Sequence, residues 1–299
     1  MEILVLLAQT LRIAVPYLLA ASGGVMSERA GLIALPLEGY MLSGAFAAAV
    51  GSYYGGSPWI GLLAGVAAGV AMAMLYAVAT IRFRGDQVVV GIAVNLLAIG
   101  LTRFLLRLAF DSSSNSPRVA GFSDTQVAGS TANSSGLYEA LTNPVVLLGL
   151  LAVPITAFVL YRTPFGLRTR AVGEHPQAAV TLGVPVNRVR YLAVGISGAL
   201  AGLGGTYLAL DQHQFTDSMT AGRGFIALAA VIFGRWDPVR VAVACVIFAA
   251  AETTMIRLQG ASGIPSQFVE MLPYLLTIIA LAGFVGRARA PAALGKVEE

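Results

Sequence analysis

A serine and a histidine on one apolar segment are the first residues in this sequence that could perform chemistry. Ser197 lies in Gly195-Ile-Ser197-Gly198, the spacing of a serine nucleophile in an intramembrane protease, and His213 follows it. A serine becomes nucleophilic only when a base lies within hydrogen-bond reach. Because His213 comes directly after the same predicted helix, the two residues are poorly placed for catalysis. Small residues around Ser197 favour close helix packing instead, so an intramembrane serine protease stays a distant alternative.

Polar residues inside apolar segments are the second chemical candidate. A charge near the centre of a bilayer is costly, so Glu38 and Glu252 should face the inside of a helix bundle or a polar cavity. Together with Asn95 and Phe225, they are the candidate residues of a pathway for a hydrophilic solute. The alternative is structural: carboxylates paired with cations, interfacial side chains, or, for Phe225, an aromatic ring used in packing.

Several kinds of site have no signature in this sequence. No Gly-x-x-x-x-Gly-Lys-Ser/Thr segment offers a nucleotide site, and neither His-Glu-x-x-His nor paired cysteines indicate a metal site. We therefore predict no catalytic residues, no metal, no cofactor and no nucleic-acid partner. A process that needs ATP would have to draw on another subunit.

Composition places the chain in a membrane. Hydrophobic residues make up 57% of its 299 residues and charged residues 11%, with a mean hydropathy of +0.78. A soluble domain carries about 25% charged residues. No segment has the composition of a separate soluble domain, so we expect one all-α transmembrane domain over residues 1–299. Its length allows about 8–10 membrane-spanning helices.

Apolar segments separated by polar loops define the expected crossings. They are 3–21, 37–53, 59–81, 88–108, 144–161, 191–210, 222–233, 241–256 and 271–286. Basic residues concentrate in alternate loops, which predicts an extracytoplasmic N-terminus and a cytoplasmic C-terminus. Loop 162–190 is then cytoplasmic, and the polar loop 111–142 is extracytoplasmic. The Gly-rich segment 22–37 and the short segment 222–233 are the two places where a broken or re-entrant helix is expected.

The longest basic interruption runs from Arg162 to Arg190. A short helix is predicted over 174–182, because Pro176 suits a first turn and Gly183 ends a helix. Its flanking arginines would anchor the loop at phospholipid headgroups. A short amphipathic helix between two spans, in a chain without its own nucleotide site, predicts a docking surface for another protein.

Four separated segments resemble one family. They begin Ser27-Glu-Arg-Ala-Gly, Arg82-Phe-Arg-Gly-Asp, Arg170-Ala-Val-Gly-Glu-His-Pro and Gly222-Arg-Gly-Phe-Ile-Ala-Leu. The family is that of inner-membrane permeases of bacterial ABC importers for ribose, other simple sugars, nucleosides and branched-chain amino acids. The simple-sugar and nucleoside branch is the most similar. The resemblance covers nearly the whole chain and implies the type II ABC-importer permease fold.

The resemblance also implies partners and residue roles. Such a permease pairs with a homologous second permease, a cytoplasmic ATP-binding cassette ATPase and an extracytoplasmic solute-binding lipoprotein. The coupling helix that docks on the ATPase would comprise Gly173, Glu174, His175, Pro176 and the residues up to Gly183. Two positions differ from the family pattern: His175 stands where Asn is frequent, and Ala34-Leu35-Pro36 replaces Asn-Ile-Gly.

Taken together, these features predict a permease subunit in the bacterial inner membrane. It would import a nucleoside or a simple sugar by alternating access, driven by ATP hydrolysis on the partner ATPase. The alternative from a different class is a stand-alone secondary transporter or channel. That protein would use Glu38 and Glu252 as ion ligands within the membrane.

Overall fold

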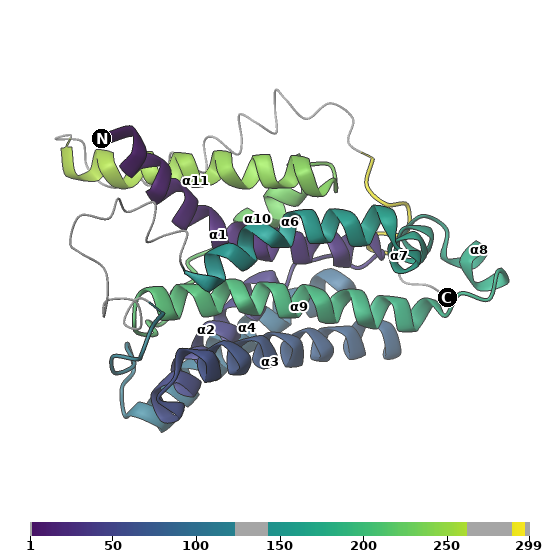
Figure 1. The fold of residues 1–299 in the computed structure, drawn as a ribbon. Helices are drawn as coiled ribbons and strands as arrows, with labels where there is room; N and C mark the ends of the chain where they lie inside the picture. The colour runs from purple at the N-terminus through teal and green to yellow at the C-terminus, as the bar shows by residue number, and fades with distance from the viewer. Residues whose placement is uncertain (1, 123–142, 262–288, 297–299) are drawn as a thin grey trace.

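The computed structural model describes residues 2–122, 143–261 and 289–296. Their regular elements are helices, and the long ones share one approximate direction (Figure 1). Among the described residues, six helices are long and apolar enough to cross a membrane. They are α1 (Glu2–Arg29), α3 (Pro58–Ala77) with its π-helical extension η1 (Val78–Arg82), α4 (Gln87–Phe110), α6 (Pro144–Arg162), α9 (Val186–Asp211) and α11 (Pro238–Ala261). The all-α membrane fold predicted from the sequence is confirmed.

The remaining described helices are α2 (Leu37–Gly55), α7 (Pro164–Glu174), α8 (Pro176–Thr181) and α10 (Arg223–Phe233). With 19 residues, α2 is long enough to span, and most of its side chains are buried inside the bundle. By contrast, α10 has 11 residues, a length of about 16 Å, roughly half of a bilayer core. The expected last span, 271–286, lies outside the described residues.

Glycines bring α2, α3 and α9 into backbone contact. A Cβ placed on Gly44 of α2 would lie 2.5 Å from the Gly202 carbonyl oxygen of α9. A Cβ on Gly198 would lie 2.5 Å from the carbonyl oxygen of Gly69 in α3, and one on Gly202 would lie 2.8 Å from that of Gly65. Small residues are what permit such close approach between membrane helices. This glycine-packed core, formed by α2, α3 and α9, is the centre of the bundle.

The first helix is longer than the sequence predicted. We expected the span to end at Ala21, with a possible break in segment 22–37, but α1 continues to Arg29 before a turn leads into α2. Its two glycines are buried: a Cβ on Gly23 would lie 2.8 Å from the Ser197 carbonyl oxygen, and one on Gly24 3.1 Å from a Leu37 methyl carbon. Tertiary packing therefore keeps helical a segment whose glycines favour a break.

Segment 222–233, where a broken or re-entrant helix was expected, forms one continuous helix, α10, whose 11 residues are fewer than a membrane span needs. After α9 ends at Asp211, residues 212–222 run without a long helix to the start of α10. They are held by the described part of loop 111–142: the Ser116 N–H donates to the Phe215 carbonyl, and the Asp217 N–H donates to the Ser114 carbonyl, each over 2.8 Å. This segment and α10 lie between the membrane-length helices α9 and α11.

Candidate functional site

Glu38 binds the N-terminus of the half-length helix α10. Its Oε1 accepts hydrogen bonds from the Thr220 hydroxyl (2.6 Å) and the Gly222 N–H (2.9 Å), and its Oε2 accepts one from the Gly224 N–H (2.7 Å). The first N–H groups of a helix lack partners within the helix and attract negative charge. The buried carboxylate thus joins α2 to α10, with both of its oxygens engaged.

Two glycines make this contact possible. Gly222 has a φ of +83°, a left-handed conformation that a residue with a side chain rarely adopts. A Cβ on Gly224 would lie 2.5 Å from the Cα of Glu38. The sequence Gly222-Arg-Gly224 is therefore the local signal for a carboxylate at the start of α10.

Glu252 is held beside the first turn of α10. The Arg223 guanidinium lies 2.8 Å from Glu252 Oε1, and the Tyr17 hydroxyl donates to Oε2. Arg223 also donates to the Met219 carbonyl oxygen over 3.1 Å. These contacts join α1, α10 and α11, and they pair a carboxylate that would be costly to leave unpaired inside a membrane.

Asn95 of α4 fixes the start of α2. Its Oδ1 accepts a hydrogen bond from the Gly39 N–H over 2.8 Å, and its Nδ2 donates to the Leu35 carbonyl oxygen over 3.1 Å. Pro36 lies between these two positions and has no N–H to donate. The buried amide therefore supplies partners where the backbone is interrupted.

Phe225 lies on the opposite, exposed side of α10. Its side chain is 47% exposed, whereas Ala227, Ala230 and Val231 of the same helix are buried in the bundle. The structure thus brings Glu38 and Glu252 together at the start of α10. It places the Asn95 side chain of α4 against Gly39, the residue after Glu38, and it leaves Phe225 on the outer face of α10.

The basic interruption forms two short helices rather than the single helix predicted over 174–182. Glu174 is the last residue of α7, and α8 begins at Pro176. His175, between them, has φ −142° and ψ 78°, because a residue that precedes proline is disfavoured in the helical region. The predicted end is correct: α8 stops at Thr181, and Gly183 follows with a φ of +76°.

These two helices are attached on one side and exposed on the other. Val172 of α7 and Ala179 of α8 are buried in a small apolar cluster with Val186 and Val189 of α9. Three large apolar residues of α7, α8 and the turn after α8 are exposed: Leu167 (62%), Val180 (59%) and Leu182 (83%). We call the exposed surface of these two helices and this turn the α7–α8 face.

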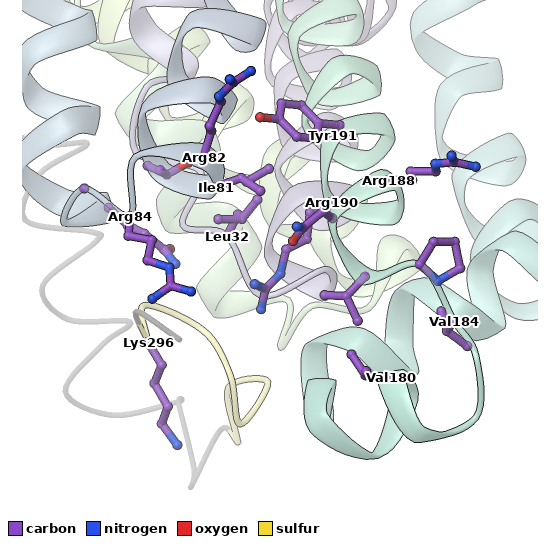
Figure 2. Close-up of a pocket in the computed structure, with 16 residues that line it drawn as sticks. Leu32, Ile81, Arg82, Arg84, Val180, Val184, Arg188, Arg190, Tyr191 and Lys296 are labelled. Carbon is purple, nitrogen blue, oxygen red and sulfur yellow. The ribbon is translucent and has the colours of Figure 1, made fainter. Parts of the chain in front are cut away.

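A basic cavity of about 900 Å³ lies beside α8. Its walls come from the turn after α3, the segment between α8 and α9, and the chain near Lys296; its basic side chains are Arg82, Arg84, Arg188, Arg190 and Lys296. In Figure 2 the side chains of Arg84 and Arg190 point toward the end of the view where Lys296 lies. No carboxylate lines the cavity among the described residues.

Comparison with known proteins decides the family. The family model for the permease component of branched-chain amino acid transport systems matches residues 6–281. The chain belongs to this permease family. It is a transmembrane permease subunit of an ABC transporter, a class of subunit that is not catalytic.

Two relatives agree with this assignment, and a solved structure has a similar fold. The guanosine ABC transporter permease protein NupQ of Bacillus subtilis is 40% identical, over 97% of this chain and 95% of that protein. The nucleoside ABC transporter permease protein NupC of Lactococcus lactis is 36% identical, with the same coverage of 97% and 95%. A solved inward-facing structure of an ABC transporter has a similar fold, with a TM-score of 0.54, 15% identity, and coverage of 92% of this chain and 84% of that one.

In this permease, Ser197 is a packing residue. Its side chain is fully buried in α9, and its hydroxyl has no hydrogen-bond partner among the described residues. His213 lies beyond the end of α9, and its Nδ1 is 3.3 Å from the Val119 carbonyl oxygen. Among the residues that the structure describes, no base lies within hydrogen-bond reach of the serine, as nucleophilic catalysis would require.

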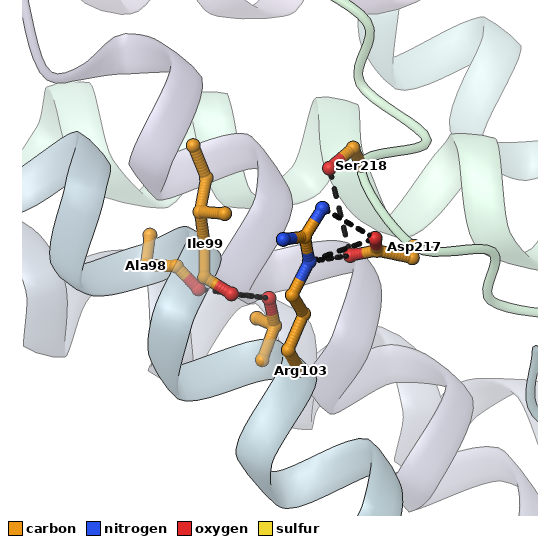
Figure 3. A network of polar contacts seen from close by, with 6 residues as sticks. Ala98, Ile99, Arg103, Asp217 and Ser218 are labelled. Carbon is orange, nitrogen blue, oxygen red and sulfur yellow. Dashed lines mark hydrogen bonds and ion pairs between the residues drawn. The ribbon is translucent and has the colours of Figure 1, made fainter. Parts of the chain in front are cut away.

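Sequence reasoning did not find the partners of several charged residues in the permease. Arg103 of α4 forms a two-point ion pair with Asp217, through Nε (2.8 and 3.0 Å) and Nη2 (2.7 Å) (Figure 3). The buried Glu28 accepts hydrogen bonds from the Trp236 indole N–H and from the Ala34 N–H. Arg103 and Asp217 are 114 positions apart, and Glu28 and Trp236 are 208 positions apart. Only the need of charged groups in a membrane protein for partners indicates that such contacts exist.

Proposed function

We propose that this permease carries a nucleoside into the cell through a pathway that it forms with a homologous second permease. The relatives named for guanosine and nucleoside transport, at 40% and 36% identity, support this substrate class. Simple sugars are the second class, from the resemblance of the four sequence segments to that branch of the family. An extracytoplasmic solute-binding lipoprotein would deliver the solute.

The exposed α7–α8 face is the observation that supports a partner ATPase as the energy source. Leu167, Val180 and Leu182 lie outside the long apolar helices, yet they are among the exposed large apolar side chains of the chain. Exposed apolar side chains rimmed by polar residues mark interaction sites. The proposed partner on this face is a cytoplasmic ATPase, with Gly173, Glu174, His175, Pro176 and Gly183 in the contact region.

The proposed orientation places the α7–α8 face in the cytoplasm of a bacterium, with the protein in the inner membrane. Arg82, Arg84, Arg188 and Arg190 surround the basic cavity at the same end of the bundle as α8, and basic residues concentrate in cytoplasmic loops. The N-terminus is then extracytoplasmic and the C-terminus cytoplasmic. Arginines of the 162–190 loop would also contact phospholipid headgroups.

The proposed pathway runs beside α10. Because Glu38, Glu252 and Asn95 use their polar atoms on neighbouring protein groups, we assign them to hold α10 and α2 in place. Phe225 is exposed on the outer face of α10 and is the candidate to face the solute and the second permease. In alternating access, movement of α7 and α8 by the ATPase would shift these helices and open the pathway to either side.

Reconstitution of the complete transporter in vesicles tests this function. We expect ATP-dependent uptake of labelled guanosine, and weaker uptake of ribose and glucose, when both permeases, the ATPase and the binding lipoprotein are present. Uptake by this chain alone without ATP would contradict the proposal and favour a stand-alone transporter. Uptake of a sugar in preference to guanosine would reject only the substrate class.

Leu182→Asp tests the docking face. A carboxylate at this 83% exposed position should not disturb the fold but should weaken ATPase binding by about tenfold or more, because it places a charge in an apolar contact. Asn187→Asp, at an exposed polar position nearby, is the matched control and should bind normally. Equal ATPase binding by both variants, measured by co-purification, would remove α8 from the interface.

A further inference from the structure

The C-terminal segment 289–296 returns to the bundle beside the end of α7, in yellow in Figure 1. Pro291 and Ala293 are buried, and Leu294 packs against the main apolar core. A chain end that served only as a surface extension would expose these residues. We call residues 289–296 the C-terminal strap.

On one side the strap is bonded to the end of α7. The Ala293 N–H donates to the Gly173 carbonyl oxygen over 2.9 Å, and the Ala292 N–H donates to Glu174 Oε2 over 3.4 Å. Gly173 also abuts the Arg29 carbonyl oxygen so closely that a Cβ would clash. The last turn of α7 is therefore enclosed between α1 and the strap.

On its other side the strap contacts the turn between α1 and α2. A Cβ built on Gly31 would lie 3.5 Å from the Cβ of Ala293, and one on Gly295 would lie 3.1 Å from the Cδ1 of Ile33. Gly31 has a φ of +89°, so the turn has a backbone conformation that few other residues adopt. The fit between strap and turn leaves no room for larger side chains at Ala293.

The α1–α2 turn is also hydrogen-bonded to α3 and α4, two helices beside the proposed pathway. The Ile33 N–H donates to the side-chain oxygen of Gln87 in α4, and the Ile33 carbonyl accepts from the Tyr76 hydroxyl in α3, each over 2.9 Å. Two residues later, Asn95 bonds Leu35 and Gly39 on either side of Pro36. Glu38 is the residue before Gly39, and its carboxylate accepts a hydrogen bond from the Gly224 N–H at the start of α10.

We propose that the C-terminal strap is the positioning segment that transmits movement of α7 to the start of α2, and through Glu38 to α10. This inference rests on the proposed coupling of α7 and α8 to an ATPase. In this proposal the strap acts by position: it keeps the end of α7 and the α1–α2 turn moving as one body. Direct hydrogen bonds and small buried side chains, rather than long flexible ones, make such a connection stiff.

Ala293→Phe, measured in the complete transporter, is the first test. The ring has no space between Gly31 and α7, so it should separate the strap from the turn while the membrane helices stay folded. We expect normal membrane insertion, ATPase co-purification and ATP hydrolysis, with guanosine transported per ATP reduced by about tenfold, a common size for coupling between two sites. Ala290→Phe, at an exposed strap position, is the control and should transport normally.

A disulfide provides the second test, and the reduced form of the same variant is the control for the strain that a side chain causes at Gly31 (φ +89°). Gly31→Cys with Ala293→Cys places the two Cβ atoms about 3.5 Å apart, within the disulfide range. The only native cysteine, Cys245, is replaced by alanine. If strap and turn move together, the oxidised transporter keeps most of its uptake, with or without reductant.

Two results would overturn the strap proposal. One is equal transport per ATP in Ala293→Phe and Ala290→Phe; the other is loss of uptake on oxidation that reductant restores, which would mean that the strap must leave the turn in each cycle. Neither result touches the docking face. Failure of the proposed function itself would appear separately, as unchanged ATPase binding in Leu182→Asp.

Discussion

The glycine-packed core of α2, α3 and α9 and the polar cluster at the start of α10 are both buried, but they are stabilised in opposite ways. In the core, glycines such as Gly65, Gly69 and Gly202 allow direct backbone contact without any charged group. In the polar cluster, Glu38, Arg223 and Glu252 hold an interrupted chain by specific hydrogen bonds and an ion pair.

The difference teaches where this permease can change shape. Backbone contacts between glycines tolerate almost no sliding, because close-packed interiors have discrete arrangements and resist gradual deformation. Hydrogen bonds to the end of a half-length helix can be exchanged for other partners or for water in a polar pathway. We therefore infer that the glycine-packed core is the fixed part and that α10 is the moving part.

The largest effect is expected from Gly202→Leu in the core. A Cβ at this position would lie 2.8 Å from the Gly65 carbonyl oxygen and 3.0 Å from the Cα of Gly69, so α3 and α9 would have to separate. We expect a loss of about 3 kcal/mol or more of folding stability. It is measured as the midpoint of thermal unfolding in detergent and as the yield of monodisperse protein.

Gly100→Leu is the matched control for this change. Gly100 lies on the exposed side of α4, and nothing lies within 4 Å of a Cβ there. The thermal stability of the Gly100→Leu variant should stay the same or rise slightly, since leucine is a better helix former than glycine. If both variants unfolded alike, glycine contacts would not be what fixes the core.

A smaller and more local effect is expected from Glu38→Ala in the polar cluster. The change removes the acceptor of the Gly222 and Gly224 N–H groups, at a cost of about 2–3 kcal/mol for buried donors left without partners. The bundle should stay folded, while hydrogen exchange in the first turn of α10 becomes faster and guanosine uptake falls.

Glu38→Gln sharpens the same comparison. The amide keeps one oxygen acceptor but places an NH₂ donor opposite an N–H group. The rate of hydrogen exchange in the first turn of α10 should therefore lie between the rates of the wild type and of Glu38→Ala. Unchanged exchange in both variants would show that the carboxylate does not hold α10. The core and the polar cluster would then not differ in the way we infer.

Sequence reasoning located six of the nine expected crossings, those that form long apolar helices in the described residues, because long apolar segments are nearly sufficient to specify membrane helices. It also identified Glu38 and Glu252 as residues that need partners, since charges in a membrane must be paired. It could not supply those partners: Thr220 is 182 positions from Glu38, and no local pattern relates two such distant residues. The continuation of α1 past Gly24 was missed for the same reason, because packing against Leu37 and Val231 decides it.

The break at His175 was within reach of the sequence. Proline at 176 disfavours helical geometry in the residue before it, so Glu174 and Pro176 belong to different helices. The strap contact between Ala293 and Gly173 was not within reach. It uses backbone groups and small side chains, which carry almost no signal in composition or periodicity.

The smallest effect is expected from the Arg103–Asp217 ion pair, which lies outside both the glycine-packed core and the polar cluster. Arg103 and Asp217 form a two-point contact, but their side chains are 57% and 22% exposed, so water and salt weaken the attraction. Arg103→Ala and Asp217→Ala should each leave thermal stability and uptake unchanged within experimental error, and a double-mutant cycle should show no clear coupling.

Asp217 nevertheless lies in segment 212–222, three residues before Thr220, which bonds Glu38. If Asp217→Ala reduced guanosine uptake as strongly as Glu38→Ala, α10 alone could not be the moving part. The moving part would then also include segment 212–222 and its ion pair with Arg103 of α4.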